Sequence, residues 1–149
     1  MKIKTIVAGA IVFYLVQMII GMLITGPWIH EGILDSAYQA TSAFWRPELR
    51  QNPPDMAALM PYWITVGLIS AFLQTMIFIS LRPVMKGPGW LQGLKFGLLM
   101  WLIAAMMMAA WSGVFNLPAT IWLWWAVDLL IGYVVAAPVL GIVVEKLEK

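Results

Sequence analysis

The chain has 149 residues, of which 62% are hydrophobic and only 11% are charged, and its formal net charge is +2. Soluble domains carry about 25% charged residues, so this composition excludes a water-soluble globule and a disordered chain. The chain has no cysteine, which excludes disulfides and cysteine-bound metals, and its positive charge is too small for nucleic-acid binding. We therefore expect one small membrane domain that comprises residues 1–149.

Four apolar stretches are long enough to cross a membrane as helices, since about 20 helical residues span a hydrocarbon core of roughly 30 Å. The predicted spans cover residues 5–26, 61–81, 89–111 and 118–144, and a long loop, 27–60, joins the first two. Proline lacks the backbone N–H of a helix interior, so the prolines that flank these stretches support the limits. The sequence thus predicts an all-α membrane protein, a four-transmembrane-helix bundle.

Basic residues indicate the orientation of this bundle. They gather before the first span, between the second and third spans, and after the fourth, whereas the long loop has more acidic than basic residues. Cytoplasmic loops are enriched in Lys and Arg, so both the N and C termini are predicted to be cytoplasmic and the long loop to face outward. The basic residues on the predicted cytoplasmic side are Lys2, Lys4, Arg82, Lys86, Lys146 and Lys149.

The long outer loop begins with a helical pattern. Between Pro27 and Trp45, apolar residues recur at steps of three and four, and polar residues occupy the opposite face. We therefore expect an interfacial amphipathic helix that lies on the outer surface or caps the bundle. Further along, Asp55 is expected to cap a short lead-in to the second span. The apolar positions are Ile29, Ile33, Ala37, Ala40 and Phe44, and Leu34 and Tyr38 widen the stripe on one side.

Most of the nine tryptophans fall on or near the predicted outer side. Indole rings favour the headgroup region of a membrane, so an aromatic belt is one interpretation. A surface that contacts lipid or an apolar ligand is the functional alternative. The residues of this candidate outer aromatic surface are Trp28, Trp45, Trp63, Trp111, Trp122 and Trp125.

Small residues recur along one face of the third predicted span. They are Gly89, Gly93, Gly97, Ala105 and Ala109. Such residues let the backbones of two helices approach closely, and this packing contributes to helix association in lipid. The ladder predicts a helix-packing face, either inside the bundle or between the copies of a homo-oligomer.

Asp128 is the one acidic residue deep inside a predicted span, about 15 Å beyond Pro118 at the helical rise. A charge at this depth costs several kcal/mol unless it is paired, hydrated or neutralised. Gln17 and Gln74 are predicted at similar depths, so their amides are the expected hydrogen-bond partners. Asp128 is then either a proton or cation site of a transporter or a polar contact that ties helices together.

His30 is the one histidine of the chain, and Glu31 and Asp35 follow it in the outer loop. Adjacent helical residues do not face each other, so this group favours a solvated interfacial histidine over a metal site. We expect neither a metal nor another cofactor. A membrane enzyme that uses His30 with Glu31 or Asp35 is a third interpretation, but no nucleophile motif or phosphate loop supports it, and a non-enzymatic protein is expected.

Three segments of spans two to four carry helix-packing motifs. They are Pro61-Tyr62-Trp63 with Gly67-Leu68-Ile69, the run Gly87-Pro88-Gly89-Trp90-Leu91-Gln92-Gly93-Leu94-Lys95-Phe96-Gly97-Leu98-Leu99, and Trp124-Trp125-Ala126-Val127-Asp128. In these motifs the chain resembles a group of uncharacterised bacterial four-span membrane proteins, in which a Gly-rich turn opens span three. The resemblance implies a multi-pass protein of the bacterial inner (cytoplasmic) membrane and implies no reaction.

These patterns favour a small non-catalytic integral membrane protein, a self-assembling or accessory subunit that binds lipid or an apolar ligand. Its expected partners are membrane lipids and either further copies of the chain or a larger membrane complex. The alternative is an oligomeric proton- or cation-linked transporter of a small molecule that uses Asp128. The two hypotheses differ at this residue, because a transporter requires Asp128 to titrate and to face a cavity that water can reach.

Overall fold

The computed structural model describes residues 3–149, so Lys2 of the predicted charge pattern lies outside the described residues. Every described element is a helix. In chain order they are α1 (Ile3–Ile20), η1 (Gly21–Ile33), α2 (Asp35–Ala40), η2 (Ser42–Phe44), η3 (Pro47–Arg50), α3 (Met56–Leu81), η4 (Arg82–Val84), α4 (Gly89–Ser112) and α5 (Ala119–Glu148).

Four helical segments are long and apolar enough to cross a membrane, as the sequence predicts. They are Ile3–Ile33, Met56–Val84, Gly89–Ser112 and Ala119–Glu148. The third and fourth begin within a residue of their predicted starts. The second begins before Pro61, which lies inside α3, because the Asp55 carboxylate accepts a hydrogen bond from the Ala58 N–H at 3.1 Å and caps the helix there.

The predicted end of the first span at Pro27 is wrong. Segment η1 follows α1 directly and continues to Ile33 as a π-helix of 13 residues. Its backbone bonds join residues five apart, as in the 2.8 Å bond from the Leu34 N–H to the Ile29 carbonyl. Proline has no N–H, so in this bonding pattern the Met22 carbonyl lacks a donor at Pro27. The helix loses only this bond and continues beyond the proline. Most π-helices are single turns, and they are frequent at functional sites.

The prediction of one amphipathic helix over residues 27–45 is also wrong. Its first part belongs to η1, and a break at Leu34 separates this part from the short helices α2 and η2. Buried Ile29 and Leu34 pack against Ile121 near the start of α5, whereas Phe44 is exposed. The segment therefore caps one end of the bundle through one side of the predicted apolar stripe.

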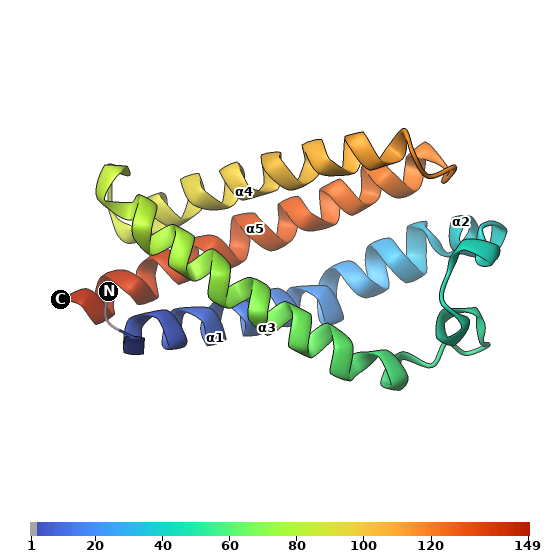
Figure 1. The fold of residues 1–149 in the computed structure, drawn as a ribbon, viewed down its shortest axis with the longest axis horizontal. Helices are drawn as coiled ribbons and strands as arrows, with labels where there is room; N and C mark the ends of the chain where they lie inside the picture. The colour runs from blue at the N-terminus through green and yellow to red at the C-terminus, as the bar shows by residue number, and fades with distance from the viewer. Residues whose placement is uncertain (1–2) are drawn as a thin grey trace.

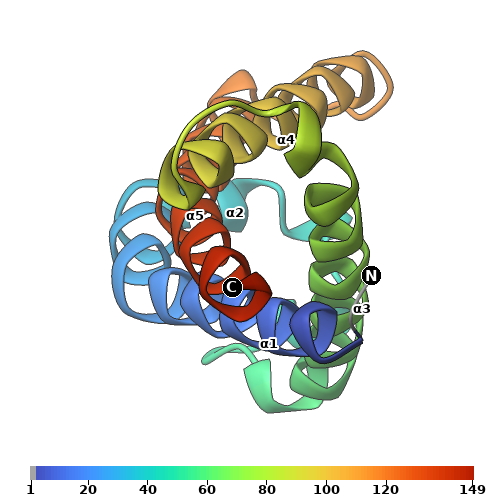
Figure 2. The ribbon, with the colours of Figure 1, turned by 90° about the vertical axis from the view of Figure 1, so that its left-hand side faces the viewer.

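The long helices are arranged in a ring. Helix α5 packs against α4 and α1, and α3 packs against α1 (Figure 1). Figure 2 shows the ring order α1, α3, α4, α5. Both ends of the described chain and the α3–α4 turn lie at one end, which we call the terminal end (Figure 1). The opposite end, which we call the loop end, holds residues 27–55 and the α4–α5 turn.

The buried side chains form one large cluster and a smaller one at the loop end. Fully buried members of the large cluster are Phe13, Phe78, Phe96, Leu140 and Val144. Outside both clusters, no residue of 61–70 in α3 or of 98–112 in α4 is buried. In a membrane, the apolar side chains of these two half-helices are therefore available to lipid.

Backbone contact between α4 and α5 explains three of the five residues of the small-residue ladder. The glycines in this contact are Gly89, Gly93 and Gly97. A Cβ added to Gly93 would lie 2.0 Å from the Ala137 carbonyl oxygen, so only glycine fits there. The structure thus places this part of the predicted packing face inside the bundle. Ala105 and Ala109, further along α4, are not buried.

Candidate functional site

His30 and Asp128 meet in the loop-end half of the bundle, between η1 and α5. The imidazole Nε2 lies 3.3 Å from the carboxylate Oδ2, although the two residues are 98 positions apart in sequence. Their side chains are 35% and 29% exposed, so neither is sealed in the core. His30 is thus a partner of Asp128 that the sequence analysis missed, since it predicted amide partners and a solvated histidine.

Tyr38 of α2 fixes the other side of the His30 ring. Its hydroxyl oxygen lies 2.7 Å from His30 Nδ1 and accepts a hydrogen bond from the Trp125 indole N–H at 2.7 Å. Because the indole only donates, the phenolic hydrogen is free to point at Nδ1. Nε2 of a neutral His30 then carries the hydrogen that faces Asp128, so every polar group in the row has a partner.

The environment of Tyr38 keeps this hydroxyl protonated. Burial raises the pKa of the phenol above its usual value; the hydrogen bond from Trp125 lowers it, and the charge of Asp128 raises it further. The Tyr38 carbonyl accepts a 3.0 Å hydrogen bond from the Trp45 indole N–H, and the two rings pack edge to face. Tyr38 is therefore a fixed donor to His30 at neutral pH.

A pocket of about 170 Å³ lies on the other side of Asp128, between α1 and α5. Its lining residues are Gln17, Ile20, Gly21, Asp128, Leu129 and Gly132. The structure therefore brings together two of the three predicted polar residues, Gln17 and Asp128. A carboxylate, an amide and a volume of several waters make this a place where a small polar ligand is able to reach Asp128.

Gln74, the third predicted residue, lies elsewhere. It belongs to the terminal-half core, where its amide N–H donates to the Ser70 hydroxyl at 2.8 Å. Its amide oxygen has no partner among the described residues. Helix depth predicted Gln74 beside Asp128, but Gln74 does not line the pocket that Asp128 and Gln17 share, so the predicted trio is only a pair.

Thr25 supplies another polar group near the carboxylate of Asp128. The residue is fully buried in η1, and its hydroxyl makes no hydrogen bond to any described residue by distance and angle. Buried hydroxyls are nearly always satisfied by protein or by water. The buried Thr25 hydroxyl is therefore close to the Asp128 carboxylate but forms no well-aligned hydrogen bond to it.

The residues of the hypothetical outer metal site do not converge. Glu31 and Asp35 are exposed, and the Asp35 carboxylate accepts a 2.8 Å hydrogen bond from Gln39. Within residues 3–149, no three side chains of His, Asp or Glu lie close enough to hold a metal ion.

The predicted outer aromatic surface is divided. Trp45, Trp122 and Trp125 pack edge to face in one cluster beside Tyr38. Trp28 stacks edge-on against Trp124, and the two remaining tryptophans lie apart on α3 and α4, where they are exposed. Three of the six residues therefore build the wall of the His30 site, and the others are spread over the apolar surface.

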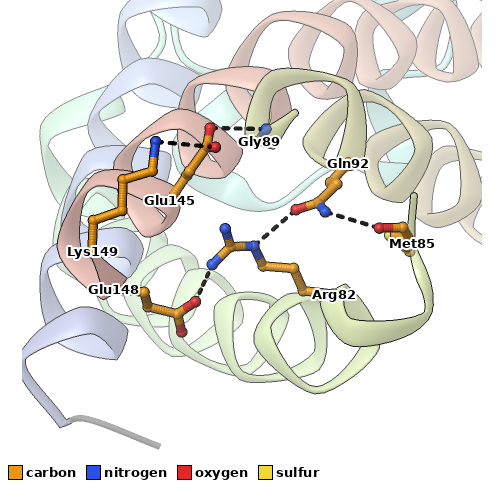
Figure 3. A network of polar contacts seen from close by, with 7 residues as sticks. All are labelled: Arg82, Met85, Gly89, Gln92, Glu145, Glu148 and Lys149. Carbon is orange, nitrogen blue, oxygen red and sulfur yellow. Dashed lines mark hydrogen bonds and ion pairs between the residues drawn. The ribbon is translucent and has the colours of Figure 1, made fainter. Parts of the chain in front are cut away.

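A second polar cluster ties the α3–α4 turn to the end of α5 at the terminal end. Figure 3 shows Arg82 between Glu148, with which it forms an ion pair, and the Gln92 amide oxygen, to which it donates at 2.8 Å. The Gly89 N–H donates to the Glu145 carboxylate at 3.0 Å. These contacts line a hollow of about 650 Å³. The sequence analysis used Arg82 only for orientation and did not predict this cluster.

The chain is thus a four-span membrane protein that has a His–Asp pair and a polar pocket between its first and last spans. No protein-family model, curated protein or solved structure matches the chain.

Proposed function

We propose that the chain is an oligomeric, proton-linked transporter of a small solute, with His30 and Asp128 as its proton site. The 3.3 Å contact between these side chains, which lie on two helices that are long and apolar enough to cross a membrane, carries the proposal. An ionisable group within a membrane span is costly and by default functional. Imidazole is the side chain that changes charge between about pH 5 and 8, so it suits a site that takes up and releases protons.

The polar groups form a path that enters the bundle from one end. In order from the loop end, the path comprises Tyr38, His30, Asp128 and Gln17. On the terminal side of Gln17, the same helices bury apolar side chains such as Phe13 and Leu140. A path that stops halfway supports alternating access, in which the site opens to each side in turn, rather than a continuous pore.

We also propose how the protein is oriented and which membrane it occupies. The basic residues near the terminal end support cytoplasmic termini, and the resemblance to bacterial four-span proteins supports the inner membrane. With this orientation, the loop end faces outward and protons reach His30 and Asp128 from outside. The exposed half-helices of α3 and α4 provide the apolar area for contact between copies.

Proton flux into liposomes tests the function. The reconstituted protein, with a pH-sensitive dye inside the vesicles, is given a pH gradient and a panel of small polar solutes. Asp128→Asn and His30→Gln are each expected to reduce solute-dependent flux at least tenfold, because either change removes the titrating pair. Glu31→Gln is the matched control, since Glu31 is exposed beside His30. Wild-type flux equal to that of empty liposomes, or full flux in Asp128→Asn, would contradict the proposal.

One observation favours a second candidate, a self-assembling or accessory subunit that binds lipid or an apolar ligand. Residues 61–70 and 98–112 contain no buried side chain, and most of their large apolar side chains are exposed, although Trp101 packs against α5. Native mass spectrometry after gentle extraction tests the accessory subunit. A stable complex with a different protein supports it, whereas a homo-oligomer fits both the transporter and a self-assembling subunit, which the flux measurement then distinguishes.

A further inference from the structure

We propose that the pocket between Gln17 and Asp128 binds a small alkali-metal cation, such as Na⁺. The inference deepens the proposed function and rests on it in one respect, because the cation would share Asp128 with the proton. The pocket's volume, about 170 Å³, holds such an ion with a few waters. Its lining residues carry one carboxylate and no basic group.

The donor atoms are the first argument. His30 contacts Asp128 Oδ2, so the Oδ1 atom keeps its lone pairs for another partner. Gln17, whose side-chain amide carries an oxygen acceptor, lines the same pocket. Hard cations prefer oxygen ligands, and a site with a single carboxylate matches one positive charge better than the several carboxylates of a typical Ca²⁺ site.

Thr25 is the second, independent argument. Its hydroxyl is fully buried, lies near Asp128 and has no hydrogen-bond partner among the described residues. Thr25 is one turn beyond Gly21, which lines the pocket. An unpartnered buried hydroxyl costs free energy, whereas a hydroxyl that coordinates a cation is satisfied. A cation bound beside Asp128 would give the Thr25 hydroxyl a well-aligned partner.

Two glycines keep the pocket open. A Cβ added to Gly21 or Gly132 would have no neighbour within 4 Å, so close packing does not require glycine at either position. Larger side chains there would project toward space that the pocket now occupies. This contrasts with Gly93, where the neighbouring backbone excludes any side chain.

Equilibrium binding in detergent tests the site without any transport. Thermal unfolding and ²³Na NMR are recorded in NaCl and in N-methylglucamine chloride at equal ionic strength. Na⁺ is expected to raise the Tm of the wild-type protein. Thr25→Val and Gln17→Leu should weaken Na⁺ binding at least tenfold, and Gly132→Val should abolish it. Thr65→Val is the matched control, since the Thr65 hydroxyl bonds only to its own helix at Pro61.

An identical wild-type Tm in the two salts, together with no broadening of the ²³Na signal, would overturn the cation site. Na⁺ binding that persists unchanged in Gly132→Val would overturn it as well, because the pocket would then not be the binding place. The outcome is separable from the proposed function. Proton-linked flux without Na⁺ binding would support the transporter and contradict the cation site. Na⁺ binding without flux would support the cation site and contradict the transporter.

Discussion

Gly93 and Ala137 bring the backbones of α4 and α5 into direct contact, since a Cβ on Gly93 would lie 2.0 Å from the Ala137 carbonyl oxygen. The clashing atom belongs to the backbone of a helix, so it is unable to move aside as a flexible side chain does. Close backbone approach of this kind is a main source of helix association in lipid, where the hydrophobic effect between helices is absent. This contact therefore holds the last two spans together.

Gly93→Ala should for this reason destabilise the bundle. Overpacking of a tight contact costs about 1–3 kcal/mol, and we expect a lower Tm and earlier unfolding in denaturing detergent. Gly132→Ala is the control, because an added Cβ there meets nothing within 4 Å. Equal loss of stability in both variants would contradict the role of this contact.

Tyr38→Phe should weaken the loop end. The change leaves the Trp125 indole N–H without its acceptor and His30 Nδ1 without its donor. A buried group that loses its partner costs about 1–3 kcal/mol, so a lower Tm and altered tryptophan fluorescence are expected. The exposed residue Tyr62 provides the control Tyr62→Phe. An unchanged Tm would show that the row of hydrogen bonds contributes little.

The ionisation of Tyr38 should be visible at alkaline pH. Burial raises its pKa in the folded state, so folding favours the protonated phenol. This contribution to stability is fully present below the unfolded pKa of about 10 and is lost as the pH rises through the higher folded value. Subtracting the phenolate absorbance of Tyr38→Phe from that of the wild type isolates the group. A midpoint at or below 10 would contradict the expected direction.

The sequence predicts the spans well because hydropathy over 20 residues does not depend on how the helices pack. It does not predict η1, since the five-residue bonding pattern that carries the chain past Pro27 has no signature in composition. Depth in the membrane places Gln17 and Gln74 alike near Asp128, but depth does not say which way a side chain faces. The pairing of His30 with Asp128 depends on the extension of the first helix through η1 and on its packing against α5, so no local motif predicts it.

The absence of cysteine makes the orientation directly measurable. Ser42→Cys and Lys149→Cys each introduce a single thiol at an exposed position, one at the loop end and one at the terminal end. With cytoplasmic termini, a membrane-impermeant maleimide should label Ser42→Cys on intact cells and Lys149→Cys only after permeabilisation. The reverse pattern would invert the orientation and would place the His30 site on the cytoplasmic side.

Arg82 should act as a latch at the terminal end, because it joins the α3–α4 turn to Glu148 of α5 and to Gln92 of α4. Alternating access requires this end to open while the loop end closes. Arg82→Gln is expected to increase maleimide labelling of a Met85→Cys reporter about fivefold, the factor that corresponds to roughly 1 kcal/mol. The Tm should change little, since partly exposed ion pairs contribute only about 0–1 kcal/mol.

Arg46→Gln is the matched control for this latch, because it removes an exposed ion pair with Glu48 at the opposite end. Equal labelling rates of the reporter in the presence and absence of Arg82 would mean that the terminal end is held by helix packing alone. The Arg82–Glu148 ion pair would then not control the opening of the terminal end, and the latch would be contradicted.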